Sequence, residues 1–237
     1  MDKHIAVTLT ANAGVLMRFP CGAGCAVDAL HDEKQRGWST VTPEMLPRIW
    51  SAFGPEGPGL VMATHSHPDH FSPRLWAEAR KMWPGAVLVS PEGEEGALRP
   101  QGELFSFEAG GFSVEARRLP HEGREYAGVP HYGYLISREG FTVLCAGDCA
   151  VCAPALAEWL GGRRPDLAIL DFPWLTLTRG RRYTEDIIRP RRLFLCHLPF
   201  EGDDLGGYLP AALAAAGKET EIGDVRCLTR PFETLRA

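Results

Sequence analysis

The sequence predicts an α+β fold in a single domain that spans residues 1–237. Short apolar runs separated by turns rich in Gly and Pro indicate twelve β-strands, whereas only four stretches carry the longer amphipathic pattern of a helix. A chain of 237 residues with 45% hydrophobic content can build one full core, and no repeat or linker divides it.

The strands are assigned from the apolar runs, and two pairs of runs flank tight turns that predict hairpins, at residues 20–24 and at Gly110–Gly111. The expected strands are residues 5–10, 14–19, 25–30, 59–63, 86–90, 104–107, 112–116, 131–137, 142–146, 167–170, 192–196 and 225–229. The expected helices are residues 43–50, 74–83, 153–160 and 205–217, the last one covering an outer face.

Charge and composition exclude several classes of protein. The net charge of -5 argues against a general nucleic-acid binder, which would carry a basic field. No apolar run approaches the ~20 residues of a membrane span, and we expect no signal peptide, because no long apolar run follows the charges of residues 1–5. Seven cysteines are an odd number in a chain too large for a disulfide scaffold, so we expect a cytoplasmic protein. The sequence leaves open whether it forms a homo-oligomer.

The most informative stretch is residues 64–70, Thr-His-Ser-His-Pro-Asp-His, which holds three of the eight histidines. It follows the predicted buried strand at residues 59–63 and precedes a predicted helix, and ligands bind at such strand ends in α/β architectures. His65 and His67 alternate with Ser66, so both imidazoles face one side of an extended loop. Asp69 and His70 follow the turn at Pro68 and can face a neighbouring point. Imidazole and carboxylate ligands in this pattern predict a site for two divalent ions, zinc first, with manganese and iron as alternatives.

The pattern His-x-His-x-Asp-His at residues 65–70 resembles the signature of the metallo-β-lactamase superfamily of hydrolases. The resemblance implies a four-layer αββα sandwich with a metal pair at one edge and three further ligands in a fixed order. The resemblance covers nearly the whole chain. Within the superfamily, the chain is most similar to the small cytoplasmic branch, which includes phosphodiesterases and lactonases.

The resemblance requires a histidine at the end of a later strand, and two residues compete for this position. His121 ends the strand that begins at residue 112, whereas His131 begins the next one. We expect His121 to complete the site of His65 and His67, and His131 has the same ligand chemistry. If His131 is not a ligand, it contacts the substrate, donates a proton or is structural.

The remaining implied ligands follow two apolar strands. Asp148 comes after Gly147 at the end of the strand at residues 142–146 and matches the bridging aspartate of the family. His197 ends the strand at residues 192–196. The resemblance thus assigns one metal to His65, His67 and His121. It assigns the other metal to Asp69, His70 and His197, and Asp148 is shared between the two. The seven implied ligands are His65, His67, Asp69, His70, His121, Asp148 and His197.

The implied reaction is hydrolysis, in which a hydroxide bridging the two metals attacks a small, anionic phosphodiester or a lactone or ester. Two divalent ions, two carboxylates and one hydroxide leave one net positive charge, which would attract anionic oxygens. We expect Asp69 to orient the hydroxide and take its proton, and His131, Tyr132 or solvent to protonate the leaving group. The expected partner is a small-molecule substrate, without membrane or nucleic acid.

Other residues are weaker candidates. Asp28 either supports a metal-binding imidazole by a hydrogen bond or caps the next loop, and His31 is expected at the surface rather than in the site. Arg179 and Arg181, expected in a loop, either grip a substrate anion or are solvated. The cysteines beside the predicted ligands are expected to be buried and unreactive; they are Cys145, Cys149, Cys152 and Cys196.

Two other functions remain open. A nuclease acting on RNA or single-stranded DNA would bind tightly and in a salt-dependent way, which the acidic charge disfavours. A metal-bound sensor would bind ligands without turnover, and it has no chemical need for a second metal.

Overall fold

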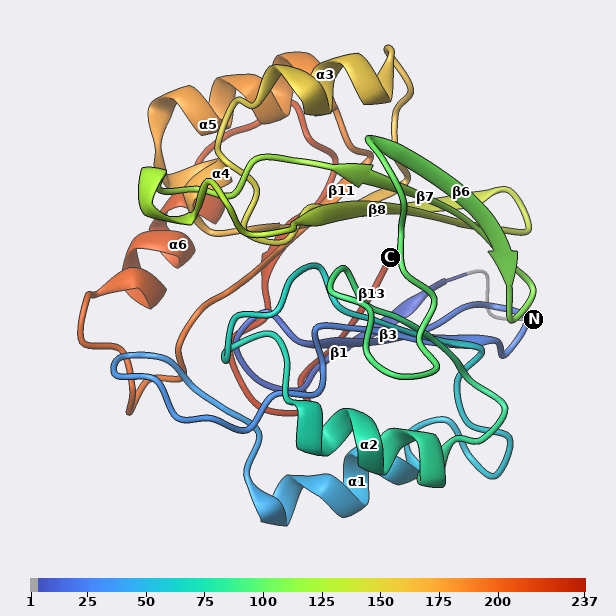
Figure 1. The fold of residues 1–237 in the computed structure, drawn as a ribbon. Coiled ribbons are helices and arrows are strands. Elements are labelled where there is room, and N and C mark those ends of the chain that lie inside the picture. Colours follow the sequence, from blue (N-terminus) through green and yellow to red (C-terminus); the bar gives the residue numbers. More distant parts are fainter. Residues whose placement is uncertain (1–3) are drawn as a thin grey trace.

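The computed structural model describes residues 4–237 and shows two β-sheets packed face to face between two layers of helices (Figure 1). Helices α1 and α2 lie against the outer face of one sheet, while α3 and α5 lie against the outer face of the other. The order of layers is therefore αββα, as predicted.

The first sheet has six strands in the order β13-β1-β2-β3-β4-β5. The pairs β13–β1, β1–β2 and β2–β3 are antiparallel, so the predicted hairpin at residues 20–24 is confirmed, whereas β3–β4 and β4–β5 are parallel. Its strands are β1 (Ala6–Leu9), β2 (Val15–Arg18), β3 (Gly24–Val27), β4 (Leu60–Met62), β5 (Val87–Val89) and β13 (Thr234–Arg236).

The second sheet has seven strands in the order β12-β11-β10-β9-β8-β7-β6. Its first three pairs are parallel and its last three are antiparallel, including the predicted hairpin of β6 and β7. The strands are β6 (Leu104–Ala109), β7 (Phe112–Arg118), β8 (Tyr132–Arg138), β9 (Phe141–Cys145), β10 (Leu167–Asp171), β11 (Arg192–Cys196) and β12 (Val225–Cys227).

The four predicted helices are present. Helix α2 begins where Ser72 accepts a hydrogen bond from the backbone N–H of Leu75 at 3.2 Å and Pro73 occupies the first helical position, where no N–H is needed. It buries Leu75, Trp76 and Ala79 against the sheet. The bounds are α1 (Leu46–Ser51), α2 (Pro73–Met82), α3 (Pro154–Leu160) and α6 (Tyr208–Ala216).

The segment after β10 is helical, whereas we expected a loop there. It forms α4 (Pro173–Thr176) and α5 (Thr178–Tyr183), followed by a π-helical turn (Thr184–Ile188). The buried hydroxyl of Thr184 donates to the carbonyl oxygens of Trp174 and Gly180 at 3.1 and 2.9 Å. These tertiary contacts hold the two short helices together although neither is long enough to be stable alone.

The main core lies between the two sheets and joins side chains from both. Phe112, Tyr134 and Phe194 of the second sheet are fully buried there beside residues of the first, such as Met17 and Leu60. The hydroxyl of Tyr134 donates to the carbonyl oxygen of Ala63 at 2.7 Å, so the one polar group of this ring is satisfied. Two smaller clusters pack the helices onto the outer faces.

Parallel strands bring their carboxyl ends to the same edge of a sheet. The loops that follow β4, β9 and β11 therefore meet at one end of the sandwich, and the loop after β7 joins them. Within residues 4–237, no helix has the length and apolar character needed to cross a bilayer.

Candidate metal centre

The loop after β4 carries four of the predicted ligands and is held from both sides. The backbone N–H of Thr64 donates to Oδ1 of Asp28 at 2.7 Å, which fixes the start of the loop. The N–H of His70 donates to the carbonyl oxygen of His67 at 2.9 Å, which closes the turn at Pro68. His65 and His70 are fully buried, and His67 is half-buried at the edge of the site.

The first cluster consists of the predicted set His65, His67, His121 and Asp148, whose ligand atoms all lie within 4.8 Å of one another. Nε2 of His65 lies 3.3 Å from Nε2 of His121, and both face Oδ2 of Asp148 at 3.9 and 3.7 Å. The structure thus selects His121 rather than His131 for this cluster.

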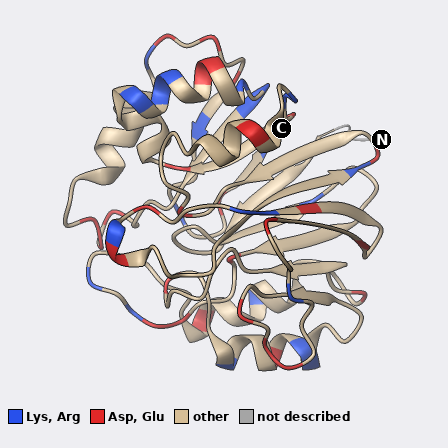
Figure 2. Cartoon of the chain, turned by 45° about the horizontal axis from the view of Figure 1, so that its top comes forward, with Lys and Arg blue, Asp and Glu red and all other residues tan. Residues whose placement is uncertain are grey.

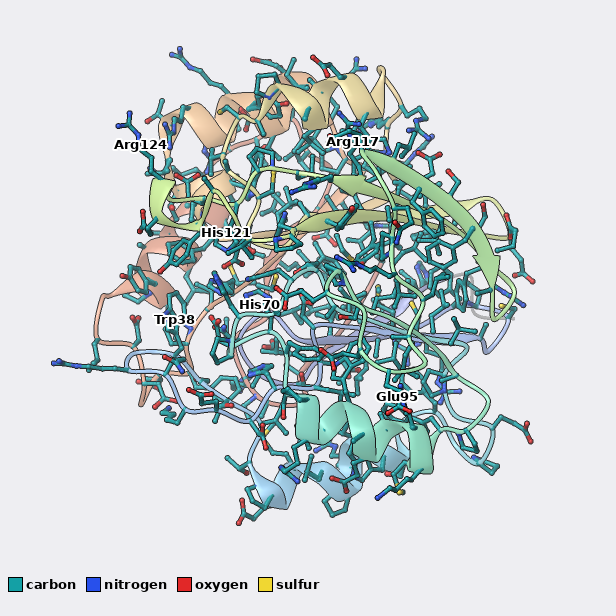
Figure 3. The ribbon with its side chains drawn as sticks, in the orientation of Figure 1. Trp38, His70, Glu95, Arg117, His121 and Arg124 are labelled. Atoms are coloured by element: carbon teal, nitrogen blue, oxygen red, sulfur yellow. The ribbon has the colours of Figure 1, made fainter. Side chains whose placement is uncertain are left out.

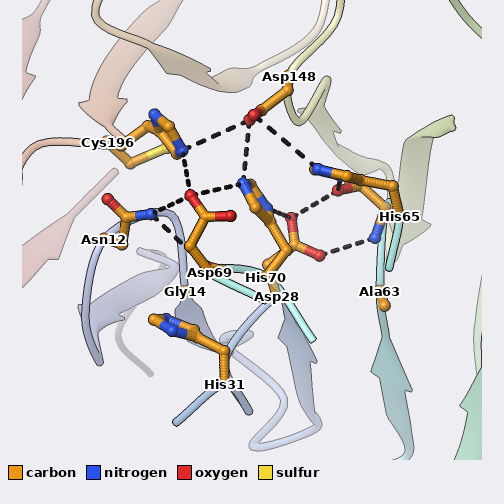
Figure 4. A network of polar contacts seen from close by, with 12 residues as sticks. Asn12, Gly14, Asp28, His31, Ala63, His65, Asp69, His70, Asp148 and Cys196 are labelled. Carbon is orange, nitrogen blue, oxygen red and sulfur yellow. Dashed lines mark hydrogen bonds and ion pairs between the residues drawn. The ribbon is translucent and has the colours of Figure 1, made fainter. Parts of the chain in front are cut away.

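The second cluster consists of Asp69, His70 and His197. Nε2 of His197 lies 3.3 Å from Oδ2 of Asp69, and Nε2 of His70 lies 3.9 Å from the same oxygen. Oδ1 of Asp148 lies 3.1 Å from Nε2 of His70 and 3.7 Å from Nε2 of His197. Its two oxygens therefore face different clusters, which is the arrangement of a bridging carboxylate (Figure 4).

Gly147 allows the chain to present Asp148 at this point. Its φ of +52° lies in the left-handed region, and a Cβ on this residue would lie 2.6 Å from Oγ1 of Thr64. The backbone of β9 can therefore turn against the histidine loop only with a glycine here.

The hydrogen bonds of three ring nitrogens show which atoms are left for a metal. Nδ1 of His70 faces Oδ2 of Asp28 at 3.0 Å, and Nδ1 of His121 faces the carbonyl oxygen of Glu122 at 2.6 Å. Both partners only accept, so both Nδ1 atoms carry a proton, and Nε2 is the atom that each ring can offer to a metal. Nδ1 of His65 lies 3.0 Å from Oγ1 of Thr64, whose own proton goes to Asp28.

Two buried atoms test whether cations fit here. Nε2 of His70 and Oδ1 of Asp148 lie 3.1 Å apart, yet neither makes a hydrogen bond within the described chain. Nε2 of His65 and Nε2 of His121 also face each other at close range. Nitrogen and oxygen atoms gathered in this way repel one another unless a proton or a metal ion lies between them, and although burial disfavours the charge on His70, Asp148 and Asp28 raise the pKa of His70 well above its ordinary value. The residues present therefore fit a pair of metal ions, which would take the place of that proton.

The electrostatics of the protein without metal reflect the same crowding. Burial, reinforced by the charge of His70, lowers the pKa of His65 well below its ordinary value. Burial also disfavours the charge on His197, but Asp148 and Asp171 outweigh it and raise the pKa of His197 to about 9. Burial alone would raise the pKa of Asp148, but His197 and His70 hold it well below its usual range.

The clusters open onto a cavity of about 510 Å³. Two aromatic side chains that the sequence did not reveal lie on either side of the metal ligands. The ring centre of Trp38 lies 4.5 Å from that of His197, and the ring of Tyr126 lies 4.8 Å from His67 and 4.9 Å from His121. The lining residues are Gln35, Arg36, Trp38, His67, Pro68, Asp69, His121, Tyr126, Asp148 and His197.

Asp28 contacts the imidazole of a candidate ligand, since its carboxylate accepts from both His70 and Thr64. His131 is fully buried behind the first cluster, where burial lowers its pKa to about 3, and it does not line the cavity. His31 is also fully buried, beside the carbonyl oxygen of Ala11, so the expectation of a surface histidine was wrong.

Three predicted substrate contacts are not brought to the cavity. The hydroxyl of Tyr132 donates to the carbonyl oxygen of Gly102 at 2.9 Å, and its ring belongs to the core between the sheets. Arg179 and Arg181 lie on helix α5 rather than in a free loop. Arg181 donates to the carbonyl oxygen of Ala215 and therefore points toward α6. Arg179 is exposed and lines a different cavity with Cys152. We therefore withdraw these three as substrate ligands.

Asn12 and Asp171 complete the surroundings of the second cluster, and sequence reasoning missed both. Nδ2 of Asn12 donates to Oδ2 of Asp69 at 3.1 Å, and the backbone carbonyl oxygen of Asn12 accepts from the N–H of His197 at 3.0 Å. Asp171, at the end of β10, is buried beside Asp148 and His197 with Oδ1 lacking a partner in the described chain. Burial and the charge of Asp148 raise the pKa of Asp171 well above its usual range.

Three of the four cysteines next to the ligands are buried as expected, and the expectation was wrong for Cys152. Cys145, Cys149 and Cys196 are buried, and burial raises the pKa of each thiol. None of them belongs to either metal cluster, while Cys152 is partly exposed.

Comparison with solved structures gives matches over the full chain. YhfI from Bacillus subtilis, described as a metallo-β-lactamase fold protein, has a TM-score of 0.64 at 14% identity and covers 100% of both chains. Igni18, described as a metallo hydrolase from Ignicoccus hospitalis, has a TM-score of 0.62 at 18% identity, covering 99% of this chain and 98% of its own. CmlA, a diiron β-hydroxylase from Streptomyces venezuelae, has a TM-score of 0.65 at 14% identity, and this chain spans 55% of it.

No protein-family model and no curated protein matches the sequence, so the likeness is one of structure. It extends over both sheets and both helical layers of a chain whose seven candidate ligands converge at one edge. The chain has the metallo-β-lactamase fold.

Proposed function

We propose that the chain is a dinuclear metal-dependent hydrolase of small phosphodiesters or of lactones and esters. The observation that carries the proposal is the position of Asp148, whose two oxygens face two clusters of imidazoles at the floor of an open cavity. A fold does not by itself select a chemistry, and one of the similar structures is a diiron β-hydroxylase.

The donor set favours hydrolysis. Five imidazoles and two carboxylates form the two clusters, and this mixture suits zinc first, with manganese and iron as alternatives. When bound, such a pair of cations would lower the pKa of a bound water toward neutral pH, and the cations would also polarise the oxygen of the substrate. The residues that would hold the first cation are His65, His67 and His121; Asp69, His70 and His197 would hold the second, with Asp148 between them.

The side chains around the clusters determine which groups can accept and donate protons in the reaction. Asp69 lines the cavity, and its Oδ2 is fixed by Asn12, so a carboxylate held in place is available to take a proton from the attacking water. His131 lies outside the cavity lining and its Nδ1 faces the carbonyl oxygen of Leu119 at 3.3 Å. We therefore assign protonation of the leaving group to solvent, which reaches the open cavity.

The test is an assay of protein stripped of metal and reloaded with zinc or manganese, using bis(4-nitrophenyl) phosphate and a panel of lactones. We expect turnover of one class that requires two equivalents of metal and falls at least about a hundredfold in Asp148→Asn. Asp186→Asn, an exposed carboxylate on the π-helical turn, controls for the loss of one charge. Two bound metals without turnover of either class would contradict the proposal.

A further inference from the structure

The segment Gln35–Trp38 forms one wall of the cavity above the metal clusters. Gln35, Arg36 and Trp38 all line it, although they are about 30 residues before the first ligand in the sequence. Trp38 and His121 line the same cavity, and Figure 3 shows both on the side of the molecule where His70 lies, with Arg124 further out.

This wall is anchored on both sides. The ring of Trp38 packs against His197 and stacks on Tyr208, with ring centres 5.6 Å apart and planes 10° from parallel. Behind it, Asp203 accepts from Nζ of Lys34 at 2.5 Å and from Oγ of Ser39 at 2.8 Å. The segment between Lys34 and Ser39 is therefore held at the mouth of the cavity by contacts at each end.

Arg36 is the one Lys or Arg among the residues that line this cavity. It is exposed, and within residues 4–237 its guanidinium has no hydrogen bond or ion pair. Its neighbour Lys34, by contrast, is neutralised by Asp203. A free guanidinium on an anchored wall presents several donors to a bidentate anion such as a carboxylate or phosphate.

The charge of the site explains why such a residue matters. With two divalent cations and a hydroxide bound, the carboxylates of Asp69 and Asp148 would leave one positive charge, and Asp28, bonded to His70, would cancel it. With Asp28 included, the clusters would therefore offer no net charge to attract an anion over a distance. Figure 2 shows that basic and acidic residues both occur on the helical layers on either side of the sheets, so these layers present mixed charge.

We propose that Arg36 determines specificity by binding an anionic group that the substrate carries apart from the bond to be cleaved. Trp38 and Tyr126, on opposite sides of the metal ligands, then contact the apolar part between that anion and the reacting bond. The proposal rests on the proposed hydrolase function and narrows its substrates to those with a carboxylate or phosphate at a distance from the reacting bond.

The test compares two esters of similar length, 4-nitrophenyl butyrate, which is neutral, and mono-4-nitrophenyl glutarate, which carries a carboxylate. With zinc-loaded protein we expect kcat/KM about tenfold higher for the glutarate ester, the usual size of a charge-assisted contact near the surface. In Arg36→Gln the two esters become equivalent through a higher KM for the glutarate ester, with kcat little changed. The substitution is at an exposed position, so we expect it to leave the fold unchanged.

Arg124→Gln is the matched control, because Arg124 is also exposed but lines the adjacent cavity. Equal preference for the glutarate ester in the protein with and without Arg36, or the same loss in Arg124→Gln, would overturn the proposal while leaving the hydrolase function standing. If no ester is cleaved, the hydrolase function fails for this class, and calorimetric binding of the glutaric acid mono-4-nitroanilide decides the assignment of Arg36. Binding about tenfold weaker in Arg36→Gln supports it, and unchanged or absent binding overturns it.

Discussion

Oδ2 of Asp28 lies 3.0 Å from Nδ1 of His70, and the two side chains are buried together beneath the metal clusters. The same oxygen accepts from Oγ1 of Thr64, which in turn lies 3.0 Å from Nδ1 of His65 (Figure 4). One carboxylate therefore orients an imidazole of the second cluster directly and an imidazole of the first cluster through a hydroxyl group.

Replacing Asp28 with Asn should weaken metal binding with little change in fold. The amide oxygen can still accept from the N–H of Thr64, but the amide nitrogen cannot accept the proton of His70. We expect zinc affinity to fall about 10–100-fold, measured by competition with a chromogenic chelator. Asp32→Asn, in the next loop and paired with Arg74, should leave the affinity unchanged; equal losses in both variants would refute the assignment.

Replacing Thr64 with Val keeps the shape of the side chain but removes the hydroxyl that links His65 to Asp28. Because His65 belongs to the first cluster, we expect about tenfold weaker binding of one of the two metal equivalents. The measurement is a calorimetric titration of stripped protein with zinc. Thr40→Val removes a hydroxyl that contacts His31 outside the clusters and serves as the comparison; a titration of Thr64→Val identical to that of Thr40→Val would count against the link.

Replacing Gly147 with Ala should be much more damaging than the same change at Gly161. The two residues have nearly the same φ, +52° and +53°, so both variants incur about 1 kcal/mol for a left-handed alanine. At Gly147 the new Cβ would also lie 2.6 Å from Oγ1 of Thr64, whereas at Gly161 its nearest neighbour is 3.7 Å away. We expect the free energy of unfolding, from urea titrations, to fall by at least about 2 kcal/mol more at Gly147. Similar values for the two variants would show that the close contact relaxes freely.

The ion pair of Glu115 and Arg163 should make stability depend on pH. The bonds from Arg163 hold the pKa of Glu115 below its ordinary value, so its contribution is fully present above that value and is lost as the pH falls through the lowered pKa. Glu115→Gln should therefore have a lower Tm than the parent protein at pH 7, and the gap should close toward pH 3. A gap that stays constant over this range would show that the charge of Glu115 is not the cause.

Much of the fold could be predicted because its strands are apolar runs between turn residues, and these signals are local. β13 was missed because only Leu235 of its three residues is apolar, and its pairing with β1 depends on contacts more than 200 residues apart. The helices after β10 were missed for a related reason. Gly180 and two threonines weaken the local helical preference, and the packing of Trp174 and Thr184 compensates only in the folded chain.

The ligand set could be proposed because the histidine loop and the strand ends follow the order that the family resemblance implies, and the structure brings all seven residues together. The residues that form the walls of the cavity could not be predicted from the sequence. Trp38 and Tyr126 lie in irregular segments whose path is set by distant contacts, such as the stacking of Trp38 on Tyr208. Tyr132 shows the converse, since its position next to His131 in the sequence says nothing of the core contact that removes it from the site.

The ligands come from both halves of the sandwich, and this has a consequence for how the protein assembles. His65 and its loop follow β4 of the first sheet, whereas His121, Asp148 and His197 follow β7, β9 and β11 of the second. Neither sheet alone offers a complete cluster, so tight metal binding must wait until the two sheets have docked. A bound metal would then stabilise the docked state by mass action, and we expect chelation to weaken the contact between the sheets before either sheet unfolds. The amount of bound metal would therefore indicate how much of the protein has its two sheets docked.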